Sequence, residues 1–400
     1  MTLRPITAAM PRNPIPCALV AGIIAKATQI AFCSFFRDSP RLISLITRAS
    51  QFPGGQTLLN WGPTVVIALA TGALLRLYTH TPSVNPIIPA RKTVWTVDGP
   101  FHQAIDRDIK EEAQKPGRSM IFKHWGANWI GYVCSNYPKK EADGHGIFCD
   151  AFSYVENDEI QIAAIADGNG WGKSSQRAAR AIVDGFMHFC MISDQESPAE
   201  KLVMDAAQDS QTEIEKSHKR HDPDRSYGGT TFLGGLIFKA ADGKRYFTGV
   251  NCGDCKLYHH KKNGTIVELT KPARTDATDP GGRFGPNRTE GDKTEYAFSV
   301  EVQPGDQLFF MTDGVHDNLD QNPPEKDVKE ALGVDDQRKL LTLKQFPKNE
   351  DVGQHIINFA HTHSEKYLIA LENFQNMKNA SRKEYPGKPD HMTLLVVVVK

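Results

Sequence analysis

The chain has 400 residues, and its 47 basic and 47 acidic side chains leave no net charge. A hydrophobic fraction of 40% with 24% charged residues is that of a globular protein with a buried core, which excludes a disordered chain. Because there is no overall basic excess, we expect no nucleic-acid partner.

The charges are unevenly distributed along the chain. From Met1 to Trp95 the only acidic residue is Asp38, against nine Lys and Arg residues, so the remainder is net acidic. A basic segment joined to an acidic body indicates two parts with different roles. We therefore divide the chain into an N-terminal region with a linker, residues 1–95, and a body, residues 96–400.

Two apolar segments lie in the N-terminal region. PIPCALVAGIIAKATQIAFCSFF is interrupted by Lys26, whereas LLNWGPTVVIALATGALLRLY is uncharged from Leu58 to Leu75, just long enough to span a bilayer. Basic flanks favour a membrane-associating or targeting region, with membrane contact through residues 15–78. The alternative is a pair of buried helices packed on the body. The proline-rich TPSVNPIIPARK that follows is typical of a linker.

Seven cysteines, an odd number found mostly in apolar stretches, do not resemble a disulfide framework and favour a reducing, intracellular compartment. Cys252 and Cys255 form a C-x-x-C pair followed by His259 and His260, which is half of a zinc-site pattern. No second pair accompanies it in the sequence, and the run has the pattern of a strand. We therefore expect packed thiols there.

From about Trp95 onward, short apolar runs alternate with turns. GIFCDAFSYV with EIQIAAIA, and TTFLGGLIF with RYFTGVN, predict two hairpins, and further strands are expected at KLYHH, TIVEL, EYAFSVEV, QLFFMT and MTLLVVVV. Helical periodicity appears at residues 174–190, 198–219 and 353–376. Hairpins with a few long helices predict antiparallel sheets covered by helices, which is an α+β sandwich.

The stretch IQIAAIADGNGWGKSS places Asp167 at the end of an apolar strand, before a glycine-rich loop and a helix. This order of strand, loop and helix is similar to that of a phosphate-binding P-loop. However, Asp167 occupies the position of the first glycine that the motif requires, and its carboxylate would repel phosphate. The alternative is a metal site, in which Asp167 and the carbonyl of Gly168 are hard oxygen ligands for Mg²⁺ or Mn²⁺.

Other acidic residues follow the ends of predicted strands in the same way. Asp254 ends GVNCGD, Asp313 ends LFFMTD, Asp390 precedes the last strand, and Asp150 lies inside the strand GIFCDAF. One Asp-Gly pair is only a turn, but the repeat of strand and Asp-Gly at Asp167 and Asp313 is informative. Since none of these acids has an evident basic neighbour, they predict a shared cation.

The order of ADGNGWG, YGGTTFLGGLIF, VNCGDCKLY, PGDQLFFMTDGVHDNL and PDHMTLLVVVV resembles the successive motifs of the type 2C metal-dependent Ser/Thr protein phosphatases, over about Trp125 to Lys400. The resemblance implies two packed antiparallel β-sheets flanked by helices, an α-β-β-α sandwich. It also implies a phosphoprotein substrate, whose phosphoserine or phosphothreonine is hydrolysed by a water activated by two Mg²⁺ or Mn²⁺ ions, with a third ion as an option.

The resemblance assigns a role to each acidic residue. Asp167 would bridge two metal ions, with the Gly168 carbonyl on the second. Asp313 and Asp390 would be the other ligands of the first ion, and Asp254 with Asp313 would form a weaker third metal site. The full set of implied ligands is Asp150, Asp167, Gly168, Asp254, Asp313 and Asp390.

Four positions depart from the family pattern. Cys149 stands where many members have a Glu near the metal, and His145 stands where they have the Arg that binds the substrate phosphate, so His145 joins Asp167 and Asp313 as a catalytic candidate. Asn169 replaces a His and His391 replaces an Asn. A thiol is a poor Mg²⁺ ligand, and Lys139, Lys140 and Glu141 are alternative sources of the missing groups. These changes keep open a second function, a pseudophosphatase that acts as a binding module, although the retained aspartates favour an enzyme.

Overall fold

The computed structural model of the protein describes residues 85–89, 121–135, 147–170, 172–193, 196–219, 227–271, 280–319, 339, 342–346, 351–373, 388 and 390–400. The chain divides into two compact units, Met1–Pro82 and Ser83–Lys400. The first unit contains both predicted apolar segments and lies outside the described residues, as does His145. In the described part of the chain, no helix is long and apolar enough to cross a membrane.

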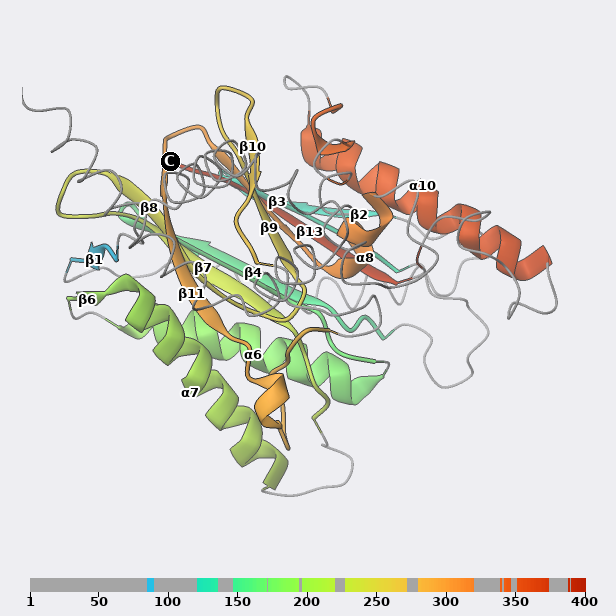
Figure 1. Ribbon diagram of the computed structural model, residues 1–400, viewed down its shortest axis with the longest axis horizontal. Coiled ribbons are helices and arrows are strands. Elements are labelled where there is room, and N and C mark those ends of the chain that lie inside the picture. Colours follow the sequence, from blue (N-terminus) through green and yellow to red (C-terminus); the bar gives the residue numbers. More distant parts are fainter. Residues whose placement is uncertain are drawn as a thin grey trace, which may run out of the picture. The chain divides into compact units, whose positions relative to one another are not determined.

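Eleven of the described strands form two antiparallel sheets (Figure 1). The five-stranded sheet has the order β11-β8-β7-β5-β4, with strands Tyr296–Val302, Arg245–Cys252, Phe232–Lys239, Ile160–Ala166 and Ala151–Glu156. The six-stranded sheet has the order β10-β9-β12-β13-β3-β2, with strands Ile266–Glu268, Lys256–His260, Gln307–Met311, His391–Val398, Trp129–Ser135 and Phe122–Trp125. The predicted hairpins are confirmed as β4–β5 and β7–β8.

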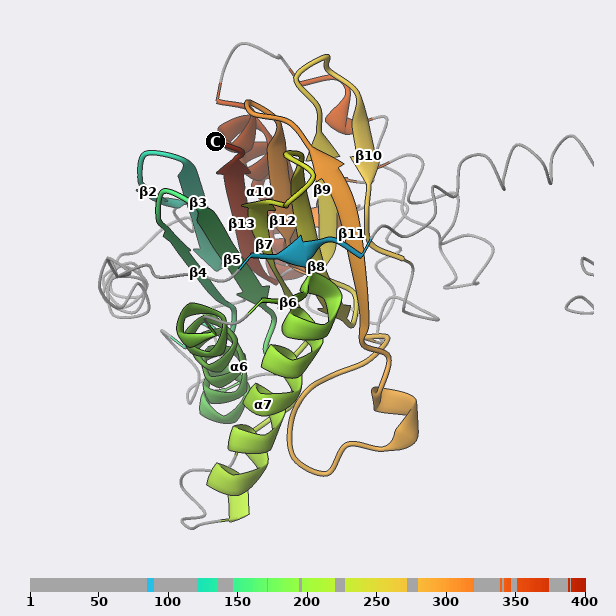
Figure 2. The ribbon, with the colours of Figure 1, turned by 90° about the vertical axis from the view of Figure 1, so that its left-hand side faces the viewer.

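Helices cover the outer face of each sheet (Figure 2). α6 (Lys173–Ile192) and α7 (Ala199–Lys219) pack on the five-stranded sheet, and α10 (Val352–Asn373) packs on the six-stranded sheet beside β13 and β3. Successive residues of a strand point to opposite faces of the sheet, so the six-stranded sheet contributes side chains to two cores, one on each face. Phe310 lies in the core between the sheets, whereas its neighbour Phe309 lies under α10. The predicted α-β-β-α sandwich is therefore confirmed.

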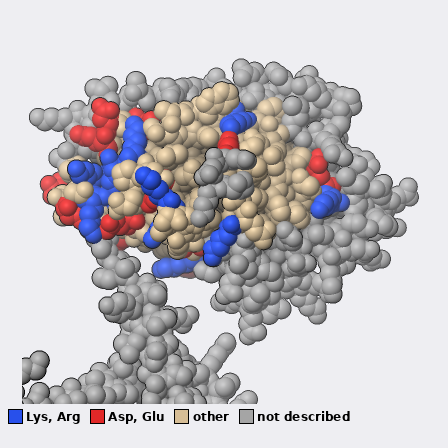
Figure 3. All heavy atoms as spheres, turned by 90° about the horizontal axis from the view of Figure 1, so that it is seen from above, with Lys and Arg blue, Asp and Glu red and all other residues tan. Residues whose placement is uncertain are grey.

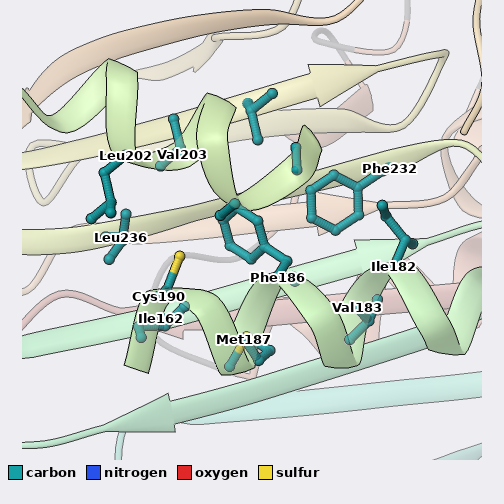
Figure 4. Packing of buried hydrophobic residues seen from close by; sticks show 14 of the residues in the cluster. Ile162, Ile182, Val183, Phe186, Met187, Cys190, Leu202, Val203, Phe232 and Leu236 are labelled. Carbon is teal, nitrogen blue, oxygen red and sulfur yellow. The ribbon is translucent and has the colours of Figure 1, made fainter. Parts of the chain in front are cut away.

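The sequence of α6 explains why this segment is helical and which face it buries. Apolar residues recur every three or four positions, which is the spacing of one helix face, and they pack against α7 and the sheet (Figure 4). Gly185 lets the two helices approach closely, since a Cβ there would lie 2.7 Å from the Ser210 hydroxyl oxygen of α7. The buried residues of α6 are Ser175, Ala178, Ala179, Ile182, Val183, Phe186, Met187 and Cys190.

A short strand, β1 (Ile87–Ile88), lies inside the predicted linker and pairs with β6 (Ser197–Pro198) at the start of α7. Ile88 is fully buried in the core under α7, and the Ala199 N–H donates to the Pro86 carbonyl at 2.9 Å. This part of the predicted N-terminal region therefore packs with the second unit, although it precedes residue 96.

Two further features bear on the sequence predictions. The hairpin of β2 and β3 was not predicted, because Gly131 interrupts the apolar run of β3. Gly131 is required by packing, since a Cβ there would lie 2.6 Å from the ring of Phe152. The prediction of packed thiols is confirmed: Cys252 and Cys255 are free and buried, and the Cys255 sulfur lies 3.2 Å from the Thr231 hydroxyl.

The surface shown in Figure 3 carries Lys and Arg side chains beside Asp and Glu side chains, with wide uncharged areas between them. On this face the described charges of opposite sign are interspersed and form no extended area of one sign. Among the exposed ion pairs of the described chain, Lys244 and Glu301 lie 2.7 Å apart, and this pair contributes little to stability because both side chains are solvated.

Candidate metal centre

Four of the predicted aspartates meet at one end of the sandwich. Asp150 directly precedes β4 and Asp167 directly follows β5, which places them side by side because Ala151 pairs with Ala166. Asp313 follows β12 and Asp390 precedes β13, the neighbouring strands at the centre of the other sheet. Asp150, Asp313 and Asp390 are each less than a tenth exposed. Sequence-distant carboxylates thus share one partly enclosed site.

The aspartates of the five-stranded sheet are electrostatically disfavoured. Burial raises the pKa of Asp150 well above its usual range, and the nearby Asp390 carboxylate raises it further. Burial likewise raises the pKa of Asp167, with added repulsion from Asp150 and Asp313. One carboxylate oxygen each of Asp150 and Asp313 is buried with no hydrogen-bond partner among the described residues. A cation would relieve both the repulsion and the missing contacts.

The aspartates of the six-stranded sheet already have a cation. The ammonium of Lys388 contacts an Asp313 carboxylate oxygen, lies 2.8 Å from Asp390 and 3.8 Å from Asp317. The prediction that these acids have no basic neighbour is therefore wrong. Burial acts to raise the pKa of Asp313, but Lys388 outweighs it and holds that pKa below its usual range. Burial would lower the pKa of Lys388, yet the carboxylates hold it well above normal.

The loop after β5 is held by Thr230 and Thr231, which directly precede β7. The Asp167 carbonyl accepts hydrogen bonds from the Thr231 N–H at 2.9 Å and from the Thr230 hydroxyl at 2.8 Å. Gly168 is tightly enclosed, because a Cβ there would lie 2.6 Å from the Ser175 carbonyl oxygen and 2.8 Å from that of Cys149. Only glycine fits at this position, so the backbone after Asp167 runs against the start of α6.

Asp254 lies at the margin of the cluster. It follows Gly253, whose φ of 97° is the left-handed conformation that glycine adopts readily. The His316 ring donates from Nε2 to the Asp254 carbonyl at 2.9 Å and fixes this turn. Asp254 is close enough to help raise the pKa of Lys388.

Two of the departures from the family pattern contact each other. The Cys149 N–H donates to His391 Nδ1 at 3.2 Å, and the His391 ring packs on Phe148 with centroids 4.8 Å apart. Burial raises the pKa of the Cys149 thiol to about 12 and lowers that of His391 to about 3. Both groups are therefore neutral near pH 7, and a neutral thiol does not bind Mg²⁺. The role predicted for His145 lies outside the described residues, as do Lys139, Lys140 and Glu141.

Lys388 and Thr312 were missed by the sequence reasoning. A signal for Lys388 was present in KPD, because residues two apart in an extended segment point to the same side and Asp390 was already selected. Nothing local marks Thr312, whose hydroxyl donates to Asp150 Oδ2 at 3.0 Å across the two sheets.

The residues fit a divalent cation, though not equally throughout the cluster. Hard carboxylate oxygens, one on Asp150 and one on Asp313 without a donor, suit Mg²⁺ or Mn²⁺. No three His, Cys, Asp or Glu side chains in the described ranges are arranged as ready ligands of one ion. The Lys388 ammonium contacts Asp313 and lies 2.8 Å from Asp390, and the neutral thiol of Cys149 adds no charge to the cluster.

Comparison with known proteins gives consistent results. The family model for protein phosphatase 2C matches residues 142–342. PP2C-like domain-containing protein CG9801 of Drosophila melanogaster is 27% identical over 199 residues, which are 46% of this chain and 28% of that protein. The chain thus matches less than a third of that relative's length.

Solved structures similar to the chain include two bacterial proteins. The serine/threonine phosphatase PstP/Ppp of Mycobacterium tuberculosis has a TM-score of 0.40 and 16% identity, over 68% of this chain and 98% of that one. PppA of Pseudomonas aeruginosa also has a TM-score of 0.40 and 16% identity, over 71% of this chain and 97% of that one.

Proposed function

Because the chain belongs to the protein phosphatase 2C family, we propose that it is a metal-dependent protein phosphatase that hydrolyses phosphoserine and phosphothreonine in a phosphoprotein substrate. The observation that carries the proposal is the meeting of Asp150, Asp167, Asp313 and Asp390 at one end of the sandwich. A group of buried like charges destabilises the fold unless a cation or a proton neutralises it, so its presence supports a cation-dependent function.

The chain's contribution to the reaction is to hold its oxygen ligands in place. Thr230 and Thr231 fix the backbone of Asp167, and Thr312 orients Asp150. Mg²⁺ or Mn²⁺, when bound, would lower the pKa of its water and neutralise charge on the phosphoryl group. The residues that would hold the ions are Asp150, Asp167, the Gly168 carbonyl, Asp254, Asp313 and Asp390.

The second candidate function is a pseudophosphatase that uses the same fold as a binding module. Two observations favour it: Lys388 already neutralises Asp313 and Asp390, and Cys149 is a buried neutral thiol. An internal cation makes the cluster compatible with a folded protein that has no bound metal. The two candidates therefore differ in whether turnover occurs when metal is supplied.

A metal-dependence assay separates the two candidates. The full chain is incubated with a phosphothreonine peptide and with an aryl phosphate, in Mn²⁺, in Mg²⁺ and in excess chelator, beside an Asp167→Asn variant. Turnover that needs metal and is lost in Asp167→Asn supports the phosphatase. If wild-type turnover in Mn²⁺ equals that of the chelated control while peptide binding persists, the binding module is the function.

The location of the protein and its N-terminal region belong to the proposal as well. We propose an intracellular protein, supported by five described cysteines that are buried and form no disulfide. Membrane or organelle association through residues 15–78 rests on the sequence alone, namely on the uncharged run from Leu58 to Leu75 and its basic flanks.

A further inference from the structure

Lys388 differs from the surface lysines of the described chain in the number of carboxylates around it. Its ammonium contacts Asp313, lies 2.8 Å from Asp390 and 3.8 Å from Asp317, and its side chain is 21% exposed. Two of these three aspartates are residues that the proposed function assigns to metal. The ammonium therefore lies where a cation would have to bind both carboxylates.

The backbone of Lys388 is fixed by two buried side chains. Asn318 donates from Nδ2 to the Lys388 carbonyl at 2.9 Å and accepts from the Lys388 N–H at 2.8 Å, while the Ser364 hydroxyl of α10 donates to the same carbonyl at 2.9 Å. Asn318 also donates to the Gly314 carbonyl at 2.7 Å, next to Asp313. One amide thus ties the lysine and its carboxylate partner together. The placement of Lys388 is built into the fold.

An ammonium and a divalent ion cannot occupy the same carboxylate oxygens. At 2.8 Å from Asp390 Oδ2, the Lys388 ammonium occupies the direction from which an ion would approach that oxygen. Metal binding to the two oxygens that Lys388 contacts therefore has to break both ion pairs, and the flexible four-carbon side chain, which is partly exposed, can move into solvent. On the other side of the cluster, no described lysine or arginine forms an ion pair with Asp150 or Asp167.

We propose that Lys388 is an internal counter-ion that competes with divalent metal for Asp313 and Asp390, so that the carboxylate oxygens it contacts bind metal only when its ammonium is displaced. The inference rests on the proposed function, since it concerns the same site. It implies a protein that stays folded without metal and needs a higher metal concentration than a site without the lysine. The side holding Asp150 and Asp167 would bind its ion without this competition.

The test is Mn²⁺ binding to the full chain by titration calorimetry, together with the melting temperature in chelator and in Mn²⁺. Lys388→Met should lower the melting temperature in chelator, because Asp313 and Asp390 then repel each other, and should raise Mn²⁺ affinity by about tenfold or more. It should also increase the gain in melting temperature on adding Mn²⁺. Lys388→Arg keeps the positive charge and should keep the weak affinity of the wild type.

A control variant separates competition from a general loss of stability. Lys256 is also a buried lysine, and its ammonium lies 2.7 Å from the carboxylate of Glu268. Glu268 does not belong to the cluster of four aspartates. Lys256→Met should lower the melting temperature but leave Mn²⁺ affinity unchanged. Should Lys388→Met not fold, Lys388→Gln, which keeps a hydrogen-bond donor, takes its place in the same measurements.

The outcomes distinguish this inference from the proposed function. If Asp167→Asn abolishes Mn²⁺ binding while Lys388→Met binds Mn²⁺ no more tightly than the wild type, the metal site stands and the counter-ion role is overturned. If neither the wild type nor Lys388→Met binds Mn²⁺, both are overturned. Tighter binding in Lys388→Met, with wild-type affinity in Lys256→Met and Lys388→Arg, supports the counter-ion.

Discussion

The Thr312 hydroxyl, at the end of the six-stranded sheet, donates a 3.0 Å hydrogen bond to Asp150 Oδ2 at the start of a strand in the other sheet. The same hydroxyl oxygen accepts from the Thr393 N–H at 2.9 Å, so one buried side chain joins both central strands of its sheet to the acidic site. The two sheets are thus joined by a polar contact at the place where the aspartates meet.

Replacing Thr312 by valine keeps the shape of the side chain and removes that donor. Asp150 then loses a bond to its buried carboxylate, so the free energy of unfolding in chelator should fall by about 1–3 kcal/mol. Urea denaturation measures this change. In the control Thr248→Val, the lost partner is the uncharged Ser299 hydroxyl at 2.8 Å, and the expected cost is about 0.5–1.5 kcal/mol. Equal or smaller loss in Thr312→Val would contradict the importance of this contact.

Asp167→Asn should remove metal binding and turnover while leaving the fold intact. The change keeps the shape of the side chain but removes its carboxylate charge. Burial and repulsion by Asp150 and Asp313 raise the pKa of that carboxyl group, so the charge is unfavourable without metal. The melting temperature in chelator should therefore hold or rise, and turnover in Mn²⁺ should fall by more than about a hundredfold. Asp242→Asn, at a solvent-exposed turn, is the matched control and should behave as wild type. Retained Mn²⁺-dependent turnover in Asp167→Asn would refute the ligand assignment.

His391 should make the metal-free protein sensitive to acid. Burial lowers its pKa to about 3, against about 6.5 in the unfolded chain, so the unfolded state binds a proton that the folded state excludes. Stability from this group is complete above pH 6.5 and is lost as the pH falls from about 6.5 toward about 3, at up to about 1.4 kcal/mol per pH unit.

His391→Asn removes that proton uptake and should flatten the dependence of unfolding free energy on pH between about pH 7 and about pH 5. Urea denaturation at several pH values in chelator gives the slope. His259 and His363 also have lowered pKa values and act in the same direction, so the slope should decrease rather than vanish. An unchanged slope would mean that the pKa of His391 is the same in the folded and unfolded states.

Deleting residues 1–93 should destabilise the second unit, whereas deleting residues 1–82 should not. The longer deletion removes β1 and with it Ile88, which is fully buried under α7. Loss of this side chain should cost about 1.5–3 kcal/mol of unfolding free energy. Thermal melting of the two shortened chains provides the comparison, and equal melting temperatures would show that β1 contributes nothing.

The N-terminal region should confer binding to lipid vesicles if the apolar segments associate with a membrane. The full chain should sediment with vesicles containing anionic lipid, and a chain beginning at Ser83 should remain in the supernatant. If the full chain does not bind vesicles, the alternative in which these segments pack as buried helices is favoured.

Much of the site was determined by the sequence alone. The strand-end positions of Asp167, Asp313 and Asp390 follow from apolar runs that are bounded by turns. Such patterns are local, so they can be recognised in the sequence without knowing the fold. The order of five motifs identified the family, and the helices at residues 174–190 and 198–219 were marked by a single apolar face. The two-sheet sandwich followed from the same patterns with the family resemblance.

The tertiary structure alone decided which charges meet. Lys388 is near Asp390 in sequence, but its contacts with Asp313 and Asp317 depend on the Asn318 and Ser364 hydrogen bonds that come from other elements. Likewise, the β2–β3 hairpin and β1 carry weak local signals, because a glycine under the Phe152 ring and a two-residue strand are explained only by what packs against them. Charge pairing and close packing act between residues distant in sequence, so no local pattern reveals them.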